Sequence, residues 1–516
     1  MYLGDLPDKH ARLTPNKLAF TDERTRLTFK QFAERVNRLA RAMKAIGVEK
    51  GERVSIIHHN CVELVEFYFA AMKIGAIAVP INYRLVTREL EMIIRDAEPK
   101  VVFVGVPYID KTIPLISRLD EVEYWISIHG SFDEFLEYDS FLVNHSTELV
   151  QDEKQINEDD VAAIIYTGGT TGKPKGVMHT YRSFTATTME AVNLKLTTND
   201  VQLKLAPIFH ATFVTILYSL MVGSRTHLIS HFPGVEPFLR IIEKEGITWS
   251  TIPPAVTLYI ANMDPYEAEK YDFSKFRVLI NGASPLAGNQ LRKALEILDC
   301  QVCNSAGMTE SPVYSSLLIE DHRQVSDELL GCAGKEEMTS WLKIVDENGE
   351  ELPFGEVGEL IVKSDKGMKG YWKNPSLTEE TVRNGWVYTG DICKIEEGGI
   401  LYFLDRKKDM IISGSENIYT KEVEDVLYMH GVVLEAAVIG VPDDQWGEVA
   451  LAYIVLKEGK SLTEKELIYI CIENIAKYKV PKYIKFIAEL PRTSMGKVEK
   501  NKLRLSYLQE KAKFVN

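Results

Sequence analysis

The segment from Tyr166 to Gly176 reads YTGGTTGKPKG, and it follows an apolar run, Val161 to Ile165. Glycine lets backbone N–H groups converge on an anion, threonine adds hydroxyl donors and lysine adds positive charge. The segment is not a P-loop, because that motif needs a glycine five residues before its Gly-Lys pair and a Ser or Thr after the lysine. Those two positions hold Thr167 and Pro174. The residues therefore predict a phosphate-holding loop of another class.

Further segments carry side chains suited to nucleotide chemistry. NSAGMTE (304–310) ends in a hydroxyl and a carboxylate, and carboxylate oxygen suits a Mg²⁺ ion that also holds phosphates. GWVYTGD (385–391) ends in an acid, and PRTSMGKVEK (491–500) presents a lysine after a glycine. Alone, Thr-Gly-Asp is usually a turn, and a lysine near a C-terminus is usually a solubilising charge. Only the combination of the hydroxyl, the carboxylates and the lysine indicates a functional site.

In their order along the chain, these segments resemble the signatures of the adenylate-forming superfamily, which comprises acyl-CoA synthetases, peptide-synthetase adenylation domains and luciferases. The resemblance runs from residue 166 to residue 500, and before that it is limited to alternating strands and helices. It implies that a carboxylic acid reacts with ATP and Mg²⁺ to give an acyl-AMP, which a thiol then attacks. The expected function is that of an acyl-CoA ligase.

The resemblance also implies roles for individual residues. Lys497 would drive adenylation, Thr309 would donate to the α-phosphate, and His210 would line the site of the acid's carboxylate. Glu310 would bind Mg²⁺, with Thr170 as a further metal ligand. Asp391 and Arg406 would bind the ribose. The complete set implied for ATP and AMP is Thr167, Gly168, Gly169, Thr170, Thr171, Gly172, Lys175, Gly282, Ala283, Ser305, Ala306, Gly307, Asp391 and Arg406.

A second group is implied for CoA and for a change of conformation. The SGSEN run implies a pantetheine tunnel lined by Ser413, Gly414, Ser415 and Glu416. Trp446 is a candidate to stack on the CoA adenine, with core packing as the alternative. Lys408 matches a hinge about which the C-terminal domain swings between the two half-reactions.

Three positions depart from the superfamily pattern. Gly168 replaces a serine, so backbone N–H groups and the threonines, chiefly Thr167, Thr170 and Thr171, are expected to hold the phosphates. Ser415 replaces a glycine. Ala306 replaces an aromatic residue that stacks on adenine, which leaves the adenine platform unassigned.

The pattern of apolar residues predicts the elements that position these side chains. Residues 28–47 have a capping box and helical spacing, while 53–57, 77–81 and 100–105 read as strands, so this region predicts a parallel sheet with helices on both faces. The run 211–223 predicts a buried helix. The fold class is α/β, with a large N-terminal domain of layered sheets and flanking helices (1–405), a hinge (406–408) and a small mobile α+β C-terminal domain (409–516).

Composition limits the partners and the compartment. The net charge of −14 argues against nucleic acid as a partner, since binding to phosphate backbones needs clustered Lys and Arg. The N-terminus lacks a secretory apolar region, and no apolar run is long enough to span a bilayer. Six scattered cysteines fit a reducing cytosol. We expect a cytoplasmic protein, with peripheral membrane contact and a homodimer left open.

Three readings of the function compete. The leading one is a CoA ligase for a medium- or long-chain fatty acid, with an aryl acid (benzoate- or cinnamate-like) as its alternative substrate. The second is an adenylation enzyme that loads a carrier protein, and the third is a non-catalytic nucleotide-binding relative. The acid-pocket segments IFHATFVTILY and STIPPAVTLY are apolar and contain no Arg or Lys, which disfavours dicarboxylates.

Overall fold

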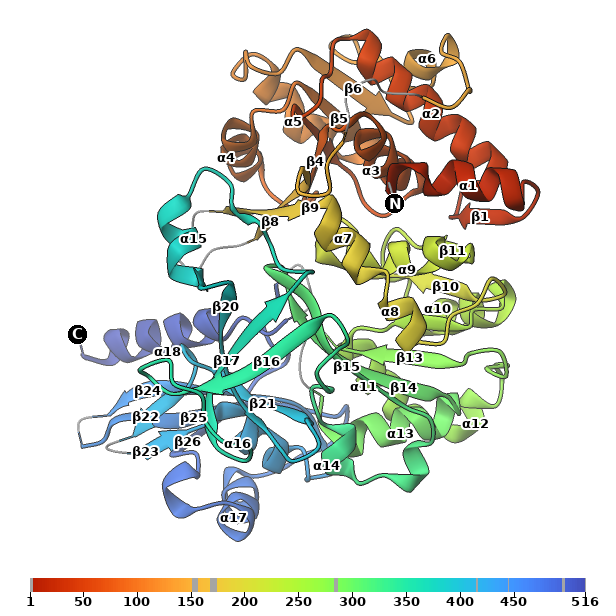
Figure 1. Ribbon diagram of the computed structural model, residues 1–516. Helices are drawn as coiled ribbons and strands as arrows, with labels where there is room; N and C mark the ends of the chain where they lie inside the picture. The colour runs from red at the N-terminus through yellow and green to blue at the C-terminus, as the bar shows by residue number, and fades with distance from the viewer. Residues whose placement is uncertain are drawn as a thin grey trace.

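The computed structural model describes residues 3–150, 156–167, 174–282, 286–413, 416–443, 445–493 and 497–515. Its elements form two eight-stranded sheets and two five-stranded sheets, which follow one another from the top to the lower left of Figure 1. No helix in the described ranges is long and apolar enough to cross a membrane.

The first sheet has the order β18-β9-β8-β4-β3-β5-β6-β7. Strands β3 to β6 are parallel, which confirms the parallel sheet predicted for β3 to β5. Alternate residues of β5 enter separate cores on the two faces. Its strands are β3 (Arg53–Ile57), β4 (Ile77–Ile81), β5 (Val101–Gly105), β6 (Tyr124–Ile128), β7 (Leu136–Glu137), β8 (Val161–Thr167), β9 (Lys175–Thr180) and β18 (Gly370–Tyr371).

Helices cover both faces of this sheet. α2 and α3 share one core with Val54 and Phe103, while α4 and α5 pack on the other face against Val102 and Val104. The predicted capping box at Thr28 is present at the start of α2. The helices are α1 (Leu6–Leu13), α2 (Phe29–Ala45), α3 (Val62–Ile74), α4 (Thr87–Ala97), α5 (Ile109–Ile116) and α6 (Tyr138–Val143).

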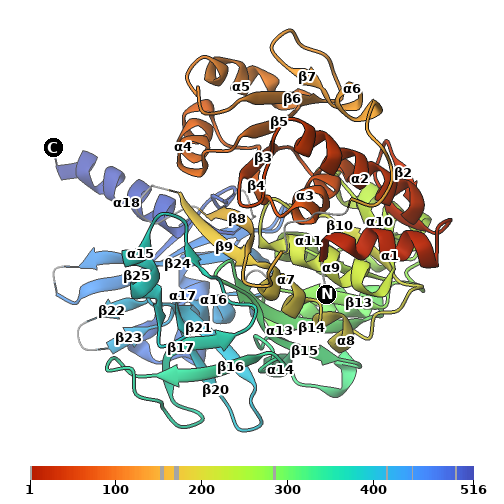
Figure 2. The same ribbon diagram turned by 45° about the horizontal axis from the view of Figure 1, so that its top comes forward.

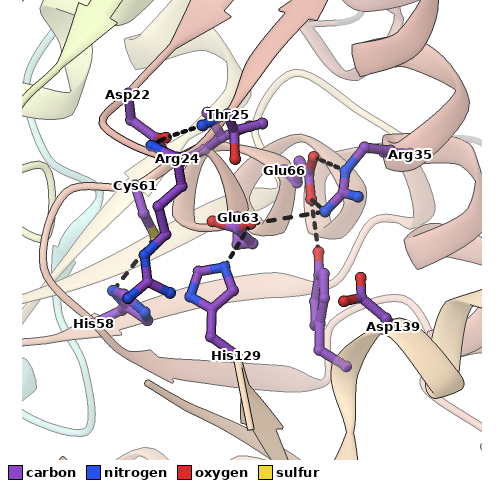
Figure 3. A network of polar contacts seen from close by, with 12 residues as sticks. Asp22, Arg24, Thr25, Arg35, His58, Cys61, Glu63, Glu66, His129 and Asp139 are labelled. Carbon is purple, nitrogen blue, oxygen red and sulfur yellow. Dashed lines mark hydrogen bonds and ion pairs between the residues drawn. The ribbon is translucent and has the colours of Figure 1, made fainter. Parts of the chain in front are cut away.

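A polar network ties these helices together beside the first sheet. Glu63 of α3 pairs with His129 after β6 at 3.0 Å and lies 3.8 Å from Arg35 of α2 (Figure 3). Arg35 also pairs with Glu66 of α3, which accepts a 2.8 Å hydrogen bond from Tyr138 of α6. Buried charges persist where partners satisfy them, so this network joins α2, α3, α6 and the end of β6 into one unit.

The second sheet has the order β15-β14-β13-β12-β10-β11-β1-β2 and is parallel from β1 to β14. Its strands are β1 (Leu18–Thr21), β2 (Arg26–Thr28), β10 (Val201–Lys204), β11 (Arg225–Leu228), β12 (Trp249–Thr251), β13 (Val278–Asn281), β14 (Gln301–Met308) and β15 (Ser311–Ile319).

Two helical layers flank the second sheet. One, with the predicted buried helix α9, shares the large core with α2 and α3, so the two eight-stranded sheets enclose a common layer. The other side packs mainly against α10, α11 and α13. The helices are α7 (Tyr181–Thr187), α8 (Glu190–Asn193), α9 (Val214–Val222), α10 (Val235–Glu245), α11 (Pro254–Ala261), α12 (Pro265–Ala268), α13 (Gly288–Leu298) and α14 (Asp327–Leu330).

The third sheet is antiparallel and precedes the predicted hinge at 406–408. Its strands are β16 (Ser340–Val345), β17 (Val357–Ser364), β19 (Val382–Arg383), β20 (Trp386–Ile395) and β21 (Leu401–Arg406), with α15 (Pro375–Thr381) beside it. β21 is its last strand, and the next strand of the chain belongs to the fourth sheet. The boundary at 406–408 and the hinge remain predictions.

The fourth sheet forms the expected small α+β unit, drawn in blue in Figures 1 and 2. Helices α16 and α17 pack on one face and α18 on the other. Its elements are β22 (Ile411–Ser413), β23 (Glu416–Ile418), α16 (Thr420–Leu427), β24 (Val433–Asp443), β25 (Gly447–Leu456), α17 (Glu464–Asn474), β26 (Tyr483–Phe486) and α18 (Lys500–Val515). The expected fold class, a large layered α/β part followed by a small α+β part, is confirmed.

Candidate active site

Thr309 and Glu310 lie at the tip of the β14–β15 hairpin. The hairpin has a bulge between Ala306 and Met308, where the pairing register shifts. Glu310 is fixed at both of its ends: its carbonyl accepts a 2.8 Å bond from the N–H of Met368, and its Oε1 accepts a 2.7 Å bond from the Tyr371 hydroxyl. The carboxylate is therefore oriented by a strand of the first sheet.

Asp391 and Arg406 are paired residues on neighbouring strands of the third sheet, β20 and β21. Arg406 Nε lies 2.7 Å from Asp391 Oδ1, and Asp391 is only 3% exposed. Burial raises the pKa of Asp391 to about 6, although the positive charges of Arg406 and Lys497 oppose the rise. A buried carboxylate held beside a guanidinium is a suitable acceptor for a pair of sugar hydroxyls.

Lys497 reaches this charged group from the C-terminal unit. It is bonded to Thr493: Thr493 N donates to Lys497 O at 2.7 Å, and Lys497 N donates to Thr493 Oγ1 at 3.2 Å. Burial and the charges of Arg406 and Lys408 lower the pKa of Lys497, whereas Asp391 and Glu310 oppose that shift. Residues that are far apart in the sequence therefore meet within electrostatic reach of one ammonium group.

His210 joins the same group from the second sheet. Its ring packs on Phe209 with centroids 4.4 Å apart, and the described residues offer its buried Nε2 no hydrogen-bond partner. Burial, together with the charges of Arg84 and Lys497, lowers the pKa of His210 to about 4. The imidazole is therefore neutral at pH 7 and can donate or accept a hydrogen bond.

The segment 166–176, predicted to hold phosphates, is described only at its two ends. Thr167 ends β8 and pairs with Lys175 at the start of β9, and Lys175 Nζ lies 5.7 Å from the centroid of the Tyr371 ring. Tyr371, which orients Glu310, therefore also lies beside the ammonium group of Lys175. Of the predicted residues, Gly168, Gly169, Thr170, Thr171, Gly172, Ala283, Gly414 and Ser415 lie outside the described ranges.

Two predicted glycines meet other backbone segments closely. A Cβ on Gly282 would lie 2.6 Å from the carbonyl oxygen of Ser305, and a Cβ on Gly307 would lie 2.3 Å from the backbone nitrogen of Val313. Both positions therefore exclude a side chain for reasons of packing alone. Ala306 packs against the core of the third sheet, and Ser305 pairs with Ser316.

The residues predicted for CoA form a separate group in the fourth sheet. Ser413 pairs with Glu416 in β23 and with Gly447 in β25, which brings Trp446 to the same edge. The side chain of Trp446 is 48% exposed, so packing in a core does not explain it. Lys408 lies in the turn between β21 and β22 and is exposed.

Two supporting residues escaped the sequence patterns. Tyr371 orients Glu310 although they are 61 positions apart. Asn60 accepts from Ile208 N at 2.9 Å and donates to the carbonyls of Leu205 and Ala206 at 3.1 and 3.2 Å, which fixes the turn that carries His210. Asn60 follows a predicted strand, but nothing in the spacing links it to a turn 148 positions away.

The carboxylate of Glu310 fits the expected Mg²⁺ ion. One oxygen is occupied by the hydroxyl of Tyr371, and the group is half-buried next to Lys497 and the end of the phosphate loop. A single carboxylate combined with phosphate oxygens is the usual protein environment of this ion.

Comparison with known proteins places the whole chain in a family. Residues 7–372 match the family described as AMP-binding enzyme, and residues 422–497 match the AMP-binding enzyme C-terminal domain. Long-chain-fatty-acid–CoA ligase FadD13 of Mycobacterium tuberculosis is 34% identical over 98% of both chains. The 2-succinylbenzoate–CoA ligase of a Geobacillus species is also 34% identical, over 96% of both chains.

A solved structure supports the same assignment. The anthranilate CoA ligase AuaEII in complex with anthranoyl-AMP has a TM-score of 0.89 at 26% identity, with 98% of this chain and 97% of that chain covered. The chain therefore belongs to the adenylate-forming superfamily of AMP-binding enzymes.

Proposed function

We propose that the protein is an ATP-dependent acid–CoA ligase that works through an acyl-AMP intermediate. One observation carries the proposal: Lys497 of the C-terminal unit lies within electrostatic reach of Glu310, Asp391, Arg406 and His210, which come from two other sheets. This is the arrangement that the first half-reaction needs, since an acid and a triphosphate carry like charges that must be offset as they approach.

In the first half-reaction a carboxylate oxygen of the acid attacks the α-phosphorus of ATP. The bond from that phosphorus to the bridging oxygen breaks, and pyrophosphate leaves with the bond's electron pair. Lys497 and Thr309 would stabilise charge on the α-phosphate, and Asp391 would hold the ribose. The 166–176 loop would hold the β- and γ-phosphates. Mg²⁺ at Glu310 would supply further charge neutralisation. The protein's contribution is thus positioning and electrostatics.

In the second half-reaction the sulfur of CoA attacks the acyl carbon, the thiol proton is lost, and AMP leaves. In the present arrangement Lys497 would cover the nucleotide, while Ser413, Glu416 and Trp446 lie at one edge of the sheet of the C-terminal unit. Rotation about Lys408 would withdraw Lys497 and bring this edge forward, a hinge motion that lets one site serve two reactions.

For the acid, we propose a monocarboxylate with an apolar body, a fatty acid first and an aryl acid second. The predicted acid-pocket segments 208–218 and 250–259 run into α9 and α11, whose side chains are largely apolar and join the two main cores. The known relatives take acids of several classes by name, so the family alone does not select among them.

The test is a panel of fatty, aryl and dicarboxylic acids incubated with ATP, Mg²⁺ and CoA, with thioester products detected by mass spectrometry. We expect acyl-CoA and AMP from apolar monocarboxylates. Acid-dependent ATP–pyrophosphate exchange without transfer to CoA would overturn the CoA-ligase assignment and leave a carrier protein as the acceptor. Absence of exchange with every acid would overturn adenylation itself.

A further inference from the structure

A buried ion pair lies beneath the hairpin that carries Thr309 and Glu310. Lys366 follows β17, Glu337 precedes β16, and their Nζ and Oε2 atoms are 2.7 Å apart. Both side chains are fully buried. Glu337 also accepts from Thr339 N at 3.1 Å and from Asn193 Nδ2 at 3.3 Å, so the carboxylate is well satisfied.

The ammonium group of Lys366 also bonds to a residue with an unusual backbone conformation, Val313. Its Nζ donates to the carbonyl of Val313 at 3.0 Å. Val313 has a φ of +49°, a conformation that is unfavourable for a β-branched side chain. The nitrogen of Val313 is the atom that a side chain on Gly307 would strike, so the unusual backbone is part of the bulge opposite Gly307.

The same short segment therefore holds the hairpin at three points. Lys366 binds Val313, Met368 N binds the carbonyl of Glu310, and Tyr371 binds the carboxylate of Glu310. The second and third bonds act on Glu310 itself. The first acts on the strand behind the tip, where a strained conformation must be kept in place for the tip to stay in register.

Stability alone gives little reason for such a pair. Two charges withdrawn from water regain little beyond their desolvation cost, and apolar residues of similar volume often replace them without loss. What an apolar pair cannot replace is the hydrogen bond to the Val313 carbonyl.

We propose that Lys366 is a positioning residue for adenylation: it holds Val313 in its left-handed conformation and thereby keeps Thr309 and Glu310 in their reactive placement. Glu337 is the buried ion partner of the lysine, whereas the bond to Val313 carries the effect on the hairpin. The inference rests on the proposed acid–CoA ligase function for its catalytic consequence, but its structural part concerns the hairpin alone.

The test compares three variants with the wild type in ATP–pyrophosphate exchange and thermal unfolding. Lys366→Met leaves Glu337 buried without its cation and should lower Tm. The double variant K366M/E337M should regain most of that Tm, yet its exchange kcat should remain about tenfold below that of the wild type, with the KM of the acid unchanged. Glu337→Gln keeps the lysine on Val313 and should retain near wild-type kcat whatever its Tm.

Two results would overturn the proposal. One is a K366M/E337M enzyme with wild-type kcat, which would make the pair purely structural. The other is an E337Q enzyme that loses as much kcat as the double variant, which would tie the rate to the ion pair rather than to the Val313 bond.

A further substitution keeps the test decisive if the double variant folds poorly. Glycine adopts a positive φ without strain, so Val313→Gly removes the need for the clamp. In the V313G background, K366M/E337M should lower kcat less than in the wild type, a non-additivity expected of residues that act on each other. Strictly additive losses contradict the proposal.

Hydrogen–deuterium exchange separates this inference from the proposed function. The amides of residues 305–316 should exchange faster in the double variant than in the wild type without any substrate present. If the wild type adenylates no acid, the ligase function fails while this comparison still stands. Equal exchange in the two proteins refutes the clamp even if the enzyme is an active ligase.

Discussion

The two sides of the candidate site are built in different ways. The nucleotide side, comprising Glu310, Asp391 and Arg406, consists of charged groups, each tied to a named partner. The acid side is the turn 207–213, which is apolar apart from the neutral imidazole of His210 and the hydroxyl of Thr212. Backbone hydrogen bonds to Asn60 fix the position of this turn. Under the proposed function, charge would select the nucleotide on the first side, and shape would select the acid on the second.

This contrast explains why the reaction can be inferred from the nucleotide side, whereas the substrate cannot be inferred from the acid side. Every ATP molecule presents the same phosphates and ribose, so the residues that bind them must be the same few types at the same places. Acids differ in their bodies, so the residues around His210 need only leave a cavity of the right form. A reaction class is therefore legible on the nucleotide side, while the identity of the acid is not.

The sharpest way to test the comparison is to remove the cation that joins the two sides. Lys497→Ala should lower the rate of ATP–pyrophosphate exchange by about 10²- to 10³-fold, as for loss of a preorganised charge at a transition state. Thioester formation from supplied acyl-AMP and CoA should be retained, since that step needs Lys497 out of the way. Both rates are measured on the same preparation.

Lys502→Ala is the matched control, because this lysine follows shortly after Lys497 in the chain, its side chain is 62% exposed and it pairs with Glu499. It should leave both half-reactions unchanged. Equal losses in the two half-reactions of K497A would show that the lysine stabilises the fold of the C-terminal unit rather than adenylation.

On the acid side, His210→Ala should raise the KM of the acid about tenfold and leave the KM of ATP unchanged, as expected for loss of one hydrogen bond to a charged group. Because the pKa of His210 is lowered to about 4, the wild-type KM of the acid should not vary between about pH 6 and pH 8 through this residue. A parallel rise in the KM of ATP would place His210 on the nucleotide side.

Local patterns in the sequence were sufficient to predict the elements and to propose which residues touch the ligands. The capping box at Thr28, the buried run of α9 and the strands β3 to β5 follow from spacing of a few residues. Lys497, Glu310 and Asp391 could be singled out because each stands in a short segment of recognisable chemistry.

The residues that hold those groups in place could not be found in this way. Tyr371, Asn60 and Lys366 act through partners 53 to 148 positions away, and each carries an ordinary residue type with no local signature. Such pairings depend on how strands from different parts of the chain come together. The left-handed conformation of Val313 is equally invisible, since valine gives no sign of it in a sequence.

Beneath the nucleotide side lies a buried acid that should reveal itself through pH. Burial raises the pKa of Glu190 to about 7 from 4.5, and the charge of Glu337 adds to the rise against the pull of Lys366. Between these two values the unfolded chain has released the proton that the folded protein keeps, so stability falls as pH rises. Glu190→Gln should therefore gain Tm relative to the wild type at about pH 8, by a few degrees, and gain little at about pH 5.

A Tm difference that stays constant across this range would show that Glu190 is not the titrating group. Glu34→Gln is the control for the same chemical change, since the side chain of this glutamate on α2 is 38% exposed.

Behind the acid side lies a buried lysine, and its pKa shift makes stability change with pH in the opposite direction. Lys204 donates to Thr212 O at 2.7 Å and to Thr215 Oγ1 at 2.9 Å, just behind the turn that carries His210, and burial lowers its pKa to about 7 from 10.5. Between these values the unfolded chain binds the extra proton, so stability rises with pH. Lys204→Met should show its most favourable Tm relative to the wild type at about pH 6, and this advantage should shrink by about pH 9 as the wild type recovers. The loss of two hydrogen bonds lowers the Tm of the variant at every pH and leaves the direction of this change the same. Thermal scans of both proteins at matched pH values measure how the Tm of the variant relative to the wild type changes with pH. If this relative Tm instead grows with pH, the lysine keeps its charge through a partner supplied on the acid side.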